Sequence, residues 1–295
     1  MTRARLAPLR VARPAARRVA RGSSLFLAAV LFLLSGRAAR AGFDQAVAYF
    51  KAGNWLEASA RFQSLVDESP GYDYGHYMLG HCLLRMGRPE EAEASFRRAV
   101  DLREDRPEYH HGLALAAHAR KRYVPALGAL SRGIPLVRDS RTAWSYLVLR
   151  AWTLAAIHRW SDAASDLERA IAIRGDPALL DMLGRAEQSL GHWDHAARAL
   201  GLALRARPDD AGLLRRFSDV LIRLAIATPD PERKRAAYAQ AAAAANRLRS
   251  VTRDDAGAAE LYGRAALGAG FYEEAEQALT AALESRPGWC PATIN

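Results

Sequence analysis

The chain has 295 residues, of which 50% are hydrophobic and 25% charged, and it contains only two cysteines. This composition is typical of a folded globular protein and excludes a collagen, a disulfide-rich miniprotein and a multi-span membrane protein. The formal net charge is +10, but residues 1–41 hold nine arginines and no acidic residue, which leaves 33 basic and 32 acidic residues in the body. Without a concentrated positive field, the body gives no compositional reason to expect nucleic-acid binding.

Residues 1–41 have the three parts of an export signal. Seven arginines within residues 1–24 precede the apolar run 25–34 (LFLAAVLFLL), and Ala39-Arg40-Ala41 forms a small-residue site before Gly42. Ten residues at about 1.5 Å each reach only about half of a bilayer core, so the run is too short to span a membrane. We therefore predict a signal peptide over 1–41, cleaved before Gly42, and a periplasmic or secreted protein. A retained anchor and an organellar transit peptide are the alternatives.

The body repeats one motif. Alanine recurs at Ala58, Ala92, Ala126, Ala163, Ala196, Ala241 and Ala275. Four positions later, on the same helical face, come Phe62, Phe96, Leu130, Leu167, Leu200, Ala245 and Leu279. A turn former and an aromatic residue usually precede the alanine, as in Gly53-Asn54-Trp55, Lys121-Arg122-Tyr123, His158-Arg159-Trp160, Gly191-His192-Trp193 and Gly270-Phe271-Tyr272. Glycine in a left-handed conformation would end one helix there, and the aromatic ring would cover the corner.

A second amphipathic stretch lies upstream of each turn. These stretches cover residues 44–52, 74–86, 108–120, 145–157, 178–190, 212–225 and 258–269. Gly80, Gly184 and Gly263 lie in the middle of three of them, where glycine costs about 1 kcal/mol relative to alanine, so we expect a neighbouring helix to approach closely there. A proline closes the second helix of three units, at Pro70, Pro208 and Pro287. The pattern predicts a helix, a tight turn, a helix and a breaker about every 34 residues.

These residues resemble the tetratricopeptide repeat, whose pattern is W-x2-L-G-x2-Y, then A-x3-F, then P. The clearest unit, residues 73–106, has Leu79-Gly80, Leu83, Gly87, Ala92, Phe96 and Ala99. The resemblance implies an all-α, right-handed superhelical solenoid of about seven helix-turn-helix repeats, with the first helix of each pair lining a concave side. The expected repeats are 42–72, 73–106, 107–143, 144–176, 177–210, 211–255 and 256–289, before a short tail 290–295.

Three departures from the pattern carry expectations of their own. The fourth unit has about three extra residues around 141–143, which leaves the register of its first helix open. The sixth has an insertion of about eleven residues, expected to form a turn-rich loop at 228–231, and an alanine-rich second helix over 235–249, expected to bury little. We also expect the last helix to leave Ala275, Leu279 and Ala282 uncovered, which predicts a homo-oligomer through this repeat.

The sequence has no local signature of catalysis. A Gly-rich phosphate loop, a G-x-S-x-G elbow and an H-E-x-x-H pair are all missing, so we predict no enzyme and no cofactor. Histidines cluster at His110, His111 and His118 and at His192 and His195, but no cysteine or carboxylate accompanies them at a metal-binding spacing, and we predict no metal. Cys82 and Cys290 are far apart in the chain and suggest two separate thiols.

The first helices supply the candidate binding residues. Projection onto the implied concave side gives an aromatic half with Tyr74, Tyr77, His81, His111 and His118. It also gives an arginine-rich half with Asp181, Arg185, Gln188, Arg215, Asp219, Arg223, Glu260 and Arg264. Aromatic rings offer contact area and arginines fix carboxylates, so we expect a peptide or helical segment there, and an acidic one. The plainer alternative is that these are ordinary solvated residues.

The sequence therefore predicts a non-catalytic interaction scaffold or adaptor that acts outside the cytoplasm and binds a protein or peptide, with no nucleic acid and no membrane span after cleavage. Two alternatives stay open. One is a self-associating component of an envelope assembly complex, and the other is the repeat portion of a larger protein with a further C-terminal domain.

Overall fold

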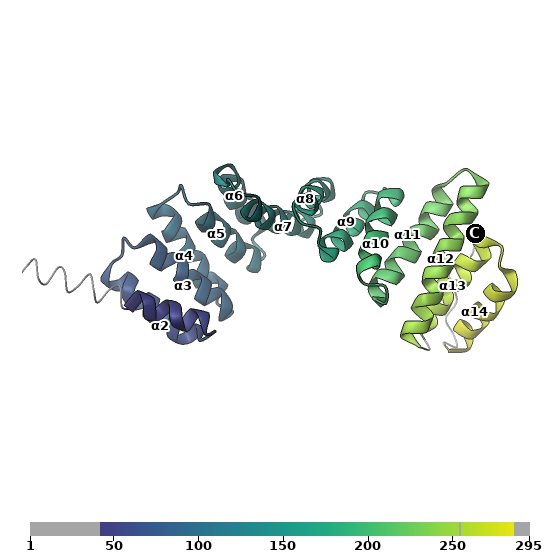
Figure 1. Cartoon of the computed structure of the whole chain (residues 1–295), viewed down its shortest axis with the longest axis horizontal. Coiled ribbons are helices and arrows are strands. Elements are labelled where there is room, and N and C mark those ends of the chain that lie inside the picture. Colours follow the sequence, from purple (N-terminus) through teal and green to yellow (C-terminus); the bar gives the residue numbers. More distant parts are fainter. Residues whose placement is uncertain (1–41, 254, 286–295) are drawn as a thin grey trace, which may run out of the picture. The chain divides into compact units, whose positions relative to one another are not determined.

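The computed structural model describes residues 42–253 and 255–285, and every regular element within those residues is helical (Figure 1). Within each of the two units described below, consecutive helices pack against one another, which confirms the predicted all-helical solenoid. The predicted signal peptide, Pro287, Cys290 and the tail lie outside the described residues. The chain divides into unit 1 (Met1–Leu102) and unit 2 (Arg103–Asn295).

Unit 1 contains two helix pairs. Residues 42–51 pair with α2 (Trp55–Glu68), and α3 (Asp73–Arg85) pairs with α4 (Pro89–Leu102). The repeated alanines and the residues four positions later form its core, because Ala58, Phe62, Ala92 and Phe96 are fully buried. Pro70 follows the end of α2 closely, as predicted for a helix breaker.

Unit 2 contains the remaining helices. They are α5 (Pro107–Ala119), α6 (Tyr123–Gly133), α7 (Ser140–Ala156), α8 (Trp160–Ile173), α9 (Pro177–Ser189), α10 (Trp193–Ala206), α11 (Ala211–Ala227), α12 (Pro231–Thr252), α13 (Ala256–Ala269) and α14 (Tyr272–Ser285). A short 3-10 helix, η1 (Ile134–Leu136), follows α6. Its core is again built from the repeated positions, since Ala126, Ala163, Ala196 and Ala241 are fully buried.

The turn within most pairs uses one left-handed residue, as the sequence predicts. Glycine supplies it at Gly53, Gly87, Gly191 and Gly270, with φ between 72° and 88°. Lys121 and His158 adopt the same conformation with φ of 59°. A left-handed conformation costs a residue with a Cβ atom about 1–2 kcal/mol, so these two turns carry strain that the glycine turns avoid.

The central glycines of the first helices do allow close helix contact. A Cβ atom on Gly80 would lie 2.9 Å from the ring of Phe96, and one on Gly263 would lie 2.6 Å from Leu279. In each case the glycine precedes its partner by sixteen residues. Gly184 has the same spacing from Leu200, and three further pairs place alanine in this register, at Ala46, Ala114 and Ala151, all fully buried. A small residue at this position is therefore what lets the helices of a pair pack tightly.

The insertion in the sixth repeat is helical, so the expectation of a turn-rich loop is wrong except for the short connection 228–230. It lengthens α11 to 17 residues and α12 to 22 residues. Asp230 caps α12 by accepting hydrogen bonds from the backbone N–H groups of Glu232 and Arg233, and Pro231 occupies the first turn. The many alanines then favour helix over loop.

The expectation that α12 buries little is also wrong. Ala241 and Leu248 are fully buried, and Ala242 and Ala245 join the same core with α11 and α13. Small side chains bring the backbones close enough for Ser218 Oγ of α11 to donate a hydrogen bond to the carbonyl of Ala241 over 3.2 Å. An alanine stripe thus packs as tightly here as larger residues do elsewhere.

The extra residues of the fourth repeat extend its first helix at the N-terminus. Helix α7 begins at Ser140 and has 17 residues. The carboxylate of Asp139 caps it by accepting a hydrogen bond from the N–H of Thr142 over 2.8 Å. The sequence left the register of this helix open, and the structure fixes it: α7 begins after η1, at the position that Asp139 caps.

The last described pair contradicts one more expectation. Ala275, Ala278 and Ala282 are buried, and Gly263 of α13 makes room for Leu279. The face of α14 that was expected to be uncovered is therefore packed against α13. The large apolar side chains that stay exposed on α14 are Tyr272 and Leu283.

Candidate functional site

The first-helix face is defined here as the surface formed by α3 in unit 1 and, separately, by α5, α7, α9, α11 and α13 in unit 2. In unit 1 it carries the predicted aromatic residues in a row. The ring of Tyr77 lies 5.6 Å from that of Tyr74 and 4.6 Å from that of His81, measured between centroids. Phe96 packs beneath, 5.9 Å from Tyr77 and 5.1 Å from His81. All three row residues are half-buried, so the row packs on the helix beneath it and keeps part of its surface accessible.

The predicted histidines of unit 2 pack between α5 and α7. The ring of His111 lies 4.9 Å from that of Tyr146. His118 Nδ1 lies 3.0 Å from Thr153 Oγ1. The Thr153 hydroxyl donates its proton to the carbonyl of Leu149, so His118 must donate from Nδ1. Burial lowers the pKa of both histidines; for His111, a backbone hydrogen bond at Ser145 opposes this shift. They are therefore neutral packing groups near pH 7.

The four predicted arginines each have an acidic partner within unit 2. Three pairs join neighbouring turns of one helix: Arg185 with Asp181 at 3.5 Å, Arg223 with Asp219 at 3.0 Å, and Arg264 with Glu260 at 3.7 Å. Arg215 of α11 pairs with Asp255, which caps α13. Gln188 contacts Asp219 over 3.5 Å. The positive charge that was expected to attract an acidic segment is thus largely balanced in place.

Arg216 is a residue that the sequence reasoning missed. Its Nε donates to Asp181 Oδ1 over 2.9 Å, and its Nη2 lies 2.7 Å from the same oxygen. This contact ties α11 to α9, so Asp181 serves two guanidinium groups. Asp181 and Arg216 are 35 residues apart, about one repeat, and this interval is the sequence signal that could have indicated their contact.

Trp152 was missed as well. It lies on α7 and is 49% exposed, although tryptophan is usually well buried. It directly follows Ala151, the small residue of its pair, just as His81 follows Gly80 and Arg185 follows Gly184. The repeat register alone could therefore have placed Trp152 on the first-helix face.

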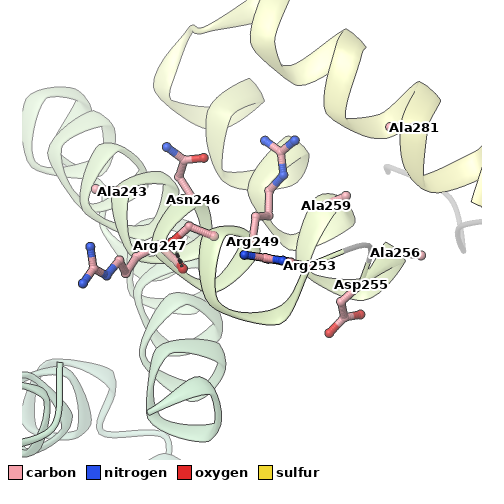
Figure 2. Close-up of a pocket in the computed structure, with 10 residues that line it drawn as sticks. Ala243, Asn246, Arg247, Arg249, Arg253, Asp255, Ala256, Ala259 and Ala281 are labelled. Atoms are coloured by element: carbon pink, nitrogen blue, oxygen red, sulfur yellow. Dashed lines mark hydrogen bonds between the residues drawn. The ribbon is translucent and has the colours of Figure 1, made fainter. Parts of the chain in front are cut away.

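A basic pocket of about 780 Å³ lies between the end of α12, the start of α13 and α14 (Figure 2). Its polar lining consists of Asn246, Arg247, Arg249, Ser250, Arg253 and Asp255. Two of these have partners elsewhere: Arg247 pairs with Asp209 at 2.6 Å, and Asp255 with Arg215. Arg249 stacks over the ring of Tyr262, with its guanidinium carbon 4.9 Å from the centroid. Within residues 42–253 and 255–285, no carboxylate pairs with Arg249 or Arg253.

Other observations bear on chemistry. The described part of the chain holds no group of three or more histidine, cysteine or acidic residues placed to bind a metal ion. No helix among the described residues is both long and apolar enough to cross a membrane. Cys82 is a free thiol, and its burial raises its pKa to about 11, so it is protonated and unreactive in the folded protein.

Comparison with known proteins agrees with the fold. The family model described as tetratricopeptide repeat matches residues 49–118. The C-terminal part of a TPR repeat-containing protein from Cytophaga hutchinsonii is similar in structure, with a TM-score of 0.65 and 15% identity over 84% of this chain and 96% of that one. A tetratricopeptide repeat protein from Parabacteroides merdae gives a TM-score of 0.55 and 14% identity over 85% and 94%. MamA gives 0.53 and 20% identity over 60% and 96%.

No curated protein sequence matched the chain. The matching family is a repeat and not an enzyme family, and these structures are less than 25% identical, so they bear on the fold alone. Residues 49–118 are therefore tetratricopeptide-repeat sequence, within an all-helical solenoid of the tetratricopeptide type.

Proposed function

We propose that this protein is a non-catalytic scaffold that binds a peptide or helical segment of a protein partner on its first-helix face. The fold supports a general interaction role, because stacked helix pairs present long continuous surfaces and few strand-end loops for catalysis. The observation that carries the proposal is the exposure of Trp152 on this face, since a large ring at the surface is stabilised when a partner covers it.

The composition of the face in unit 2 favours a partner with mixed character. Trp152 offers apolar contact area, and the paired Arg185 and Asp181 on the next first helix offer both a donor and an acceptor. Aromatic residues dominate binding energy at interfaces, whereas exposed ion pairs contribute little. We therefore expect an apolar anchor on the partner at Trp152, with polar contacts around it.

Site-specific crosslinking tests the proposal in the native host. A photo-crosslinking amino acid replaces Trp152 or Tyr77 on the first-helix face, and in control variants it replaces Val124 on α6 or Leu56 on α2, both highly exposed. A discrete product at the first-helix positions and none at the controls is the expected result. Equal products at all four positions would contradict a specific first-helix site.

We further propose that the protein acts outside the cytoplasm. The support is the sequence of residues 1–41, with its arginine-rich start, short apolar run and small-residue site. Terminal sequencing of the protein recovered from a periplasmic or extracellular fraction should give Gly42 as the first residue. A cytosolic product that retains Met1 would overturn this localisation.

Self-association is a second candidate, favoured by a specific surface. Leu267, Phe271 and Tyr272 are exposed together at the turn between α13 and α14. Burial of these side chains by a second copy would release about 25 cal/mol per Å² of apolar surface. Light scattering across a range of concentrations tests it, and a Phe271→Ser, Tyr272→Ser variant should shift the distribution toward monomer. An unchanged monomer for both proteins would exclude this surface.

A further inference from the structure

Two arginines of unit 2 that have no carboxylate partner among the described residues lie together in the basic pocket, a place that the sequence did not indicate. On the first-helix face, Arg185, Arg215, Arg223 and Arg264 all have acidic partners. In the basic pocket, Arg249 and Arg253 have none among the described residues. We infer that the basic pocket binds an acidic segment of a protein partner, whose carboxylates contact Arg249 and Arg253. The inference takes from the proposed function only that the partner is a protein.

Arg249 is the stronger of the two contacts. It is half-buried, and its guanidinium lies over the ring of Tyr262. Stacking fixes the plane of the guanidinium but leaves the N–H groups at its edge free to donate two hydrogen bonds to one carboxylate. Partial removal of a charge from water without a counter-ion costs free energy. A carboxylate therefore binds more favourably to Arg249 than to a fully exposed arginine.

The other residues that line the pocket also favour the binding of an anionic ligand. In Figure 2, Arg247 and Asp255 lie on opposite sides of the pocket, and Arg249 and Arg253 lie between them. Arg247 pairs with Asp209, and Asp255 pairs with Arg215. The amide of Asn246 adds a neutral donor on the same helix. Among the described residues that line the pocket, the two charged groups without an opposite partner are therefore both positive.

The walls determine how bulky the ligand can be. Ala243, Ala256 and Ala259 present only methyl groups, so a peptide backbone can approach α12 and α13 closely. A cavity of about 780 Å³ is within the usual range for a bound ligand of a few residues. The body of the chain has 33 basic and 32 acidic residues, so it lacks the long-range positive field that would favour a nucleic acid or a lipid surface.

Hydrogen exchange on the full-length protein with hexaglutamate as the probe tests the inference locally. The peptide should protect the backbone of residues 243–253, and an equal concentration of hexaglutamine should not. The double variant Arg249→Gln, Arg253→Gln should raise the dissociation constant, read from this protection, by about tenfold or more. Because hydrogen exchange is measured only for residues 243–253, hexaglutamate bound to the arginines of residues 1–41 does not contribute to the measured protection.

A second double variant provides the matched control. Arg233→Gln, Arg235→Gln removes two charges from the same helix, both of them exposed and neither in the lining of the pocket. It should change the dissociation constant less than twofold. Equal weakening in both doubles would show that only the general charge matters and would overturn the inference, as would hexaglutamate that gives no protection.

The single variant Arg253→Gln keeps the test decisive if Arg249 proves necessary for folding, because Arg253 is exposed, whereas Arg249 stacks on Tyr262. It should weaken binding severalfold while the melting temperature stays unchanged, and unaltered binding would count against the inference. The crosslinks expected at Trp152 do not depend on this pocket, so the failure of one proposal is distinguishable from the failure of the other.

Discussion

A Cβ atom on Gly184 would lie 2.6 Å from Cγ of Leu200, so the absence of a side chain at this position of α9 sets how closely α10 can pack. Real Cβ atoms do not approach another carbon that closely, and the contacted atom is the branch point of a fully buried leucine. Either the leucine or the helix must move when a side chain is added.

Gly184→Ala should therefore destabilise the protein by about 1–2 kcal/mol, because the overpacking penalty exceeds the gain in helix propensity. Gly128→Ala on α6 is the matched control, since nothing lies within 4 Å of the new Cβ atom. It should stabilise the protein by about 0.5–1 kcal/mol. Urea unfolding midpoints measure both, and a Gly184→Ala protein as stable as the parent would contradict the close packing of α9 and α10.

The repeated alanines should be equally sensitive in regular and irregular pairs. Ala92, Ala196 and Ala241 are all fully buried between helices. Enlarging any one of them to leucine should cost about 1–3 kcal/mol. The sequence favoured a smaller loss at Ala241, but its burial in the core formed with α11 and α13 predicts a comparable one. A clearly smaller loss at Ala241 in denaturation experiments would indicate that α12 packs loosely.

The strained turn at Lys121 offers a stabilising change. Lys121 is exposed and has a φ of 59°, which glycine adopts without steric cost. Lys121→Gly should raise the free energy of unfolding by about 0.5–1 kcal/mol, after the extra freedom of glycine in the unfolded chain is subtracted. Gly87→Ala is the reverse experiment, because Gly87 has a φ of 72° and open space around it. It should destabilise by about 1 kcal/mol. Thermal melts that move in the same direction for both would refute the argument.

The half-buried His111 and His118 predict sensitivity to mild acid. Burial lowers the pKa of His111 and His118 below the ordinary value of about 6.5. The folded state then binds fewer protons than the unfolded state, so this stability is fully present above about pH 6.5 and is lost as the pH falls toward the folded-state pKa. Urea midpoints at pH 7.5, 6.5 and 5.5 should fall, and a His111→Gln, His118→Gln variant should show a shallower fall. Identical pH profiles would contradict the assignment.

Much of this fold could be predicted from the sequence because each helix pair repeats the same short sequence pattern and the same local structure. The turn glycines, the buried alanines and the close contact of Gly80 with Phe96 all follow from short-range spacing that recurs along the chain. The sixth repeat was harder to predict because its alanine-rich segment has little hydrophobic contrast. Its tight packing depends on how near the backbones of α11 and α13 come, and spacing within one helix does not encode that distance.

The candidate site was less predictable for a different reason. Whether Arg215 is available depends on a carboxylate forty residues away, and Asp255 reaches it only because it caps the start of α13. Charge pairing across helices is therefore a tertiary property. Trp152, by contrast, occupies a register position that His81 and Arg185 also occupy, so counting from the small residue would have found it.

Trp152 provides the sharpest test of the working surface. Trp152→Ala should weaken binding of the protein that crosslinks at the first-helix face by about tenfold or more, because large aromatic residues are frequent binding hot spots. Leu202→Ala on α10 is the matched control, since Leu202 is 47% exposed and lies on a second helix. Both changes should alter stability by about 1 kcal/mol or less, as both side chains are half exposed. The purified partner should therefore bind the Leu202→Ala protein as the parent does and lose affinity only for Trp152→Ala. If Leu202→Ala weakens binding and Trp152→Ala does not, the partner occupies the surface of the second helices, and the first-helix face serves only to pack one repeat on the next.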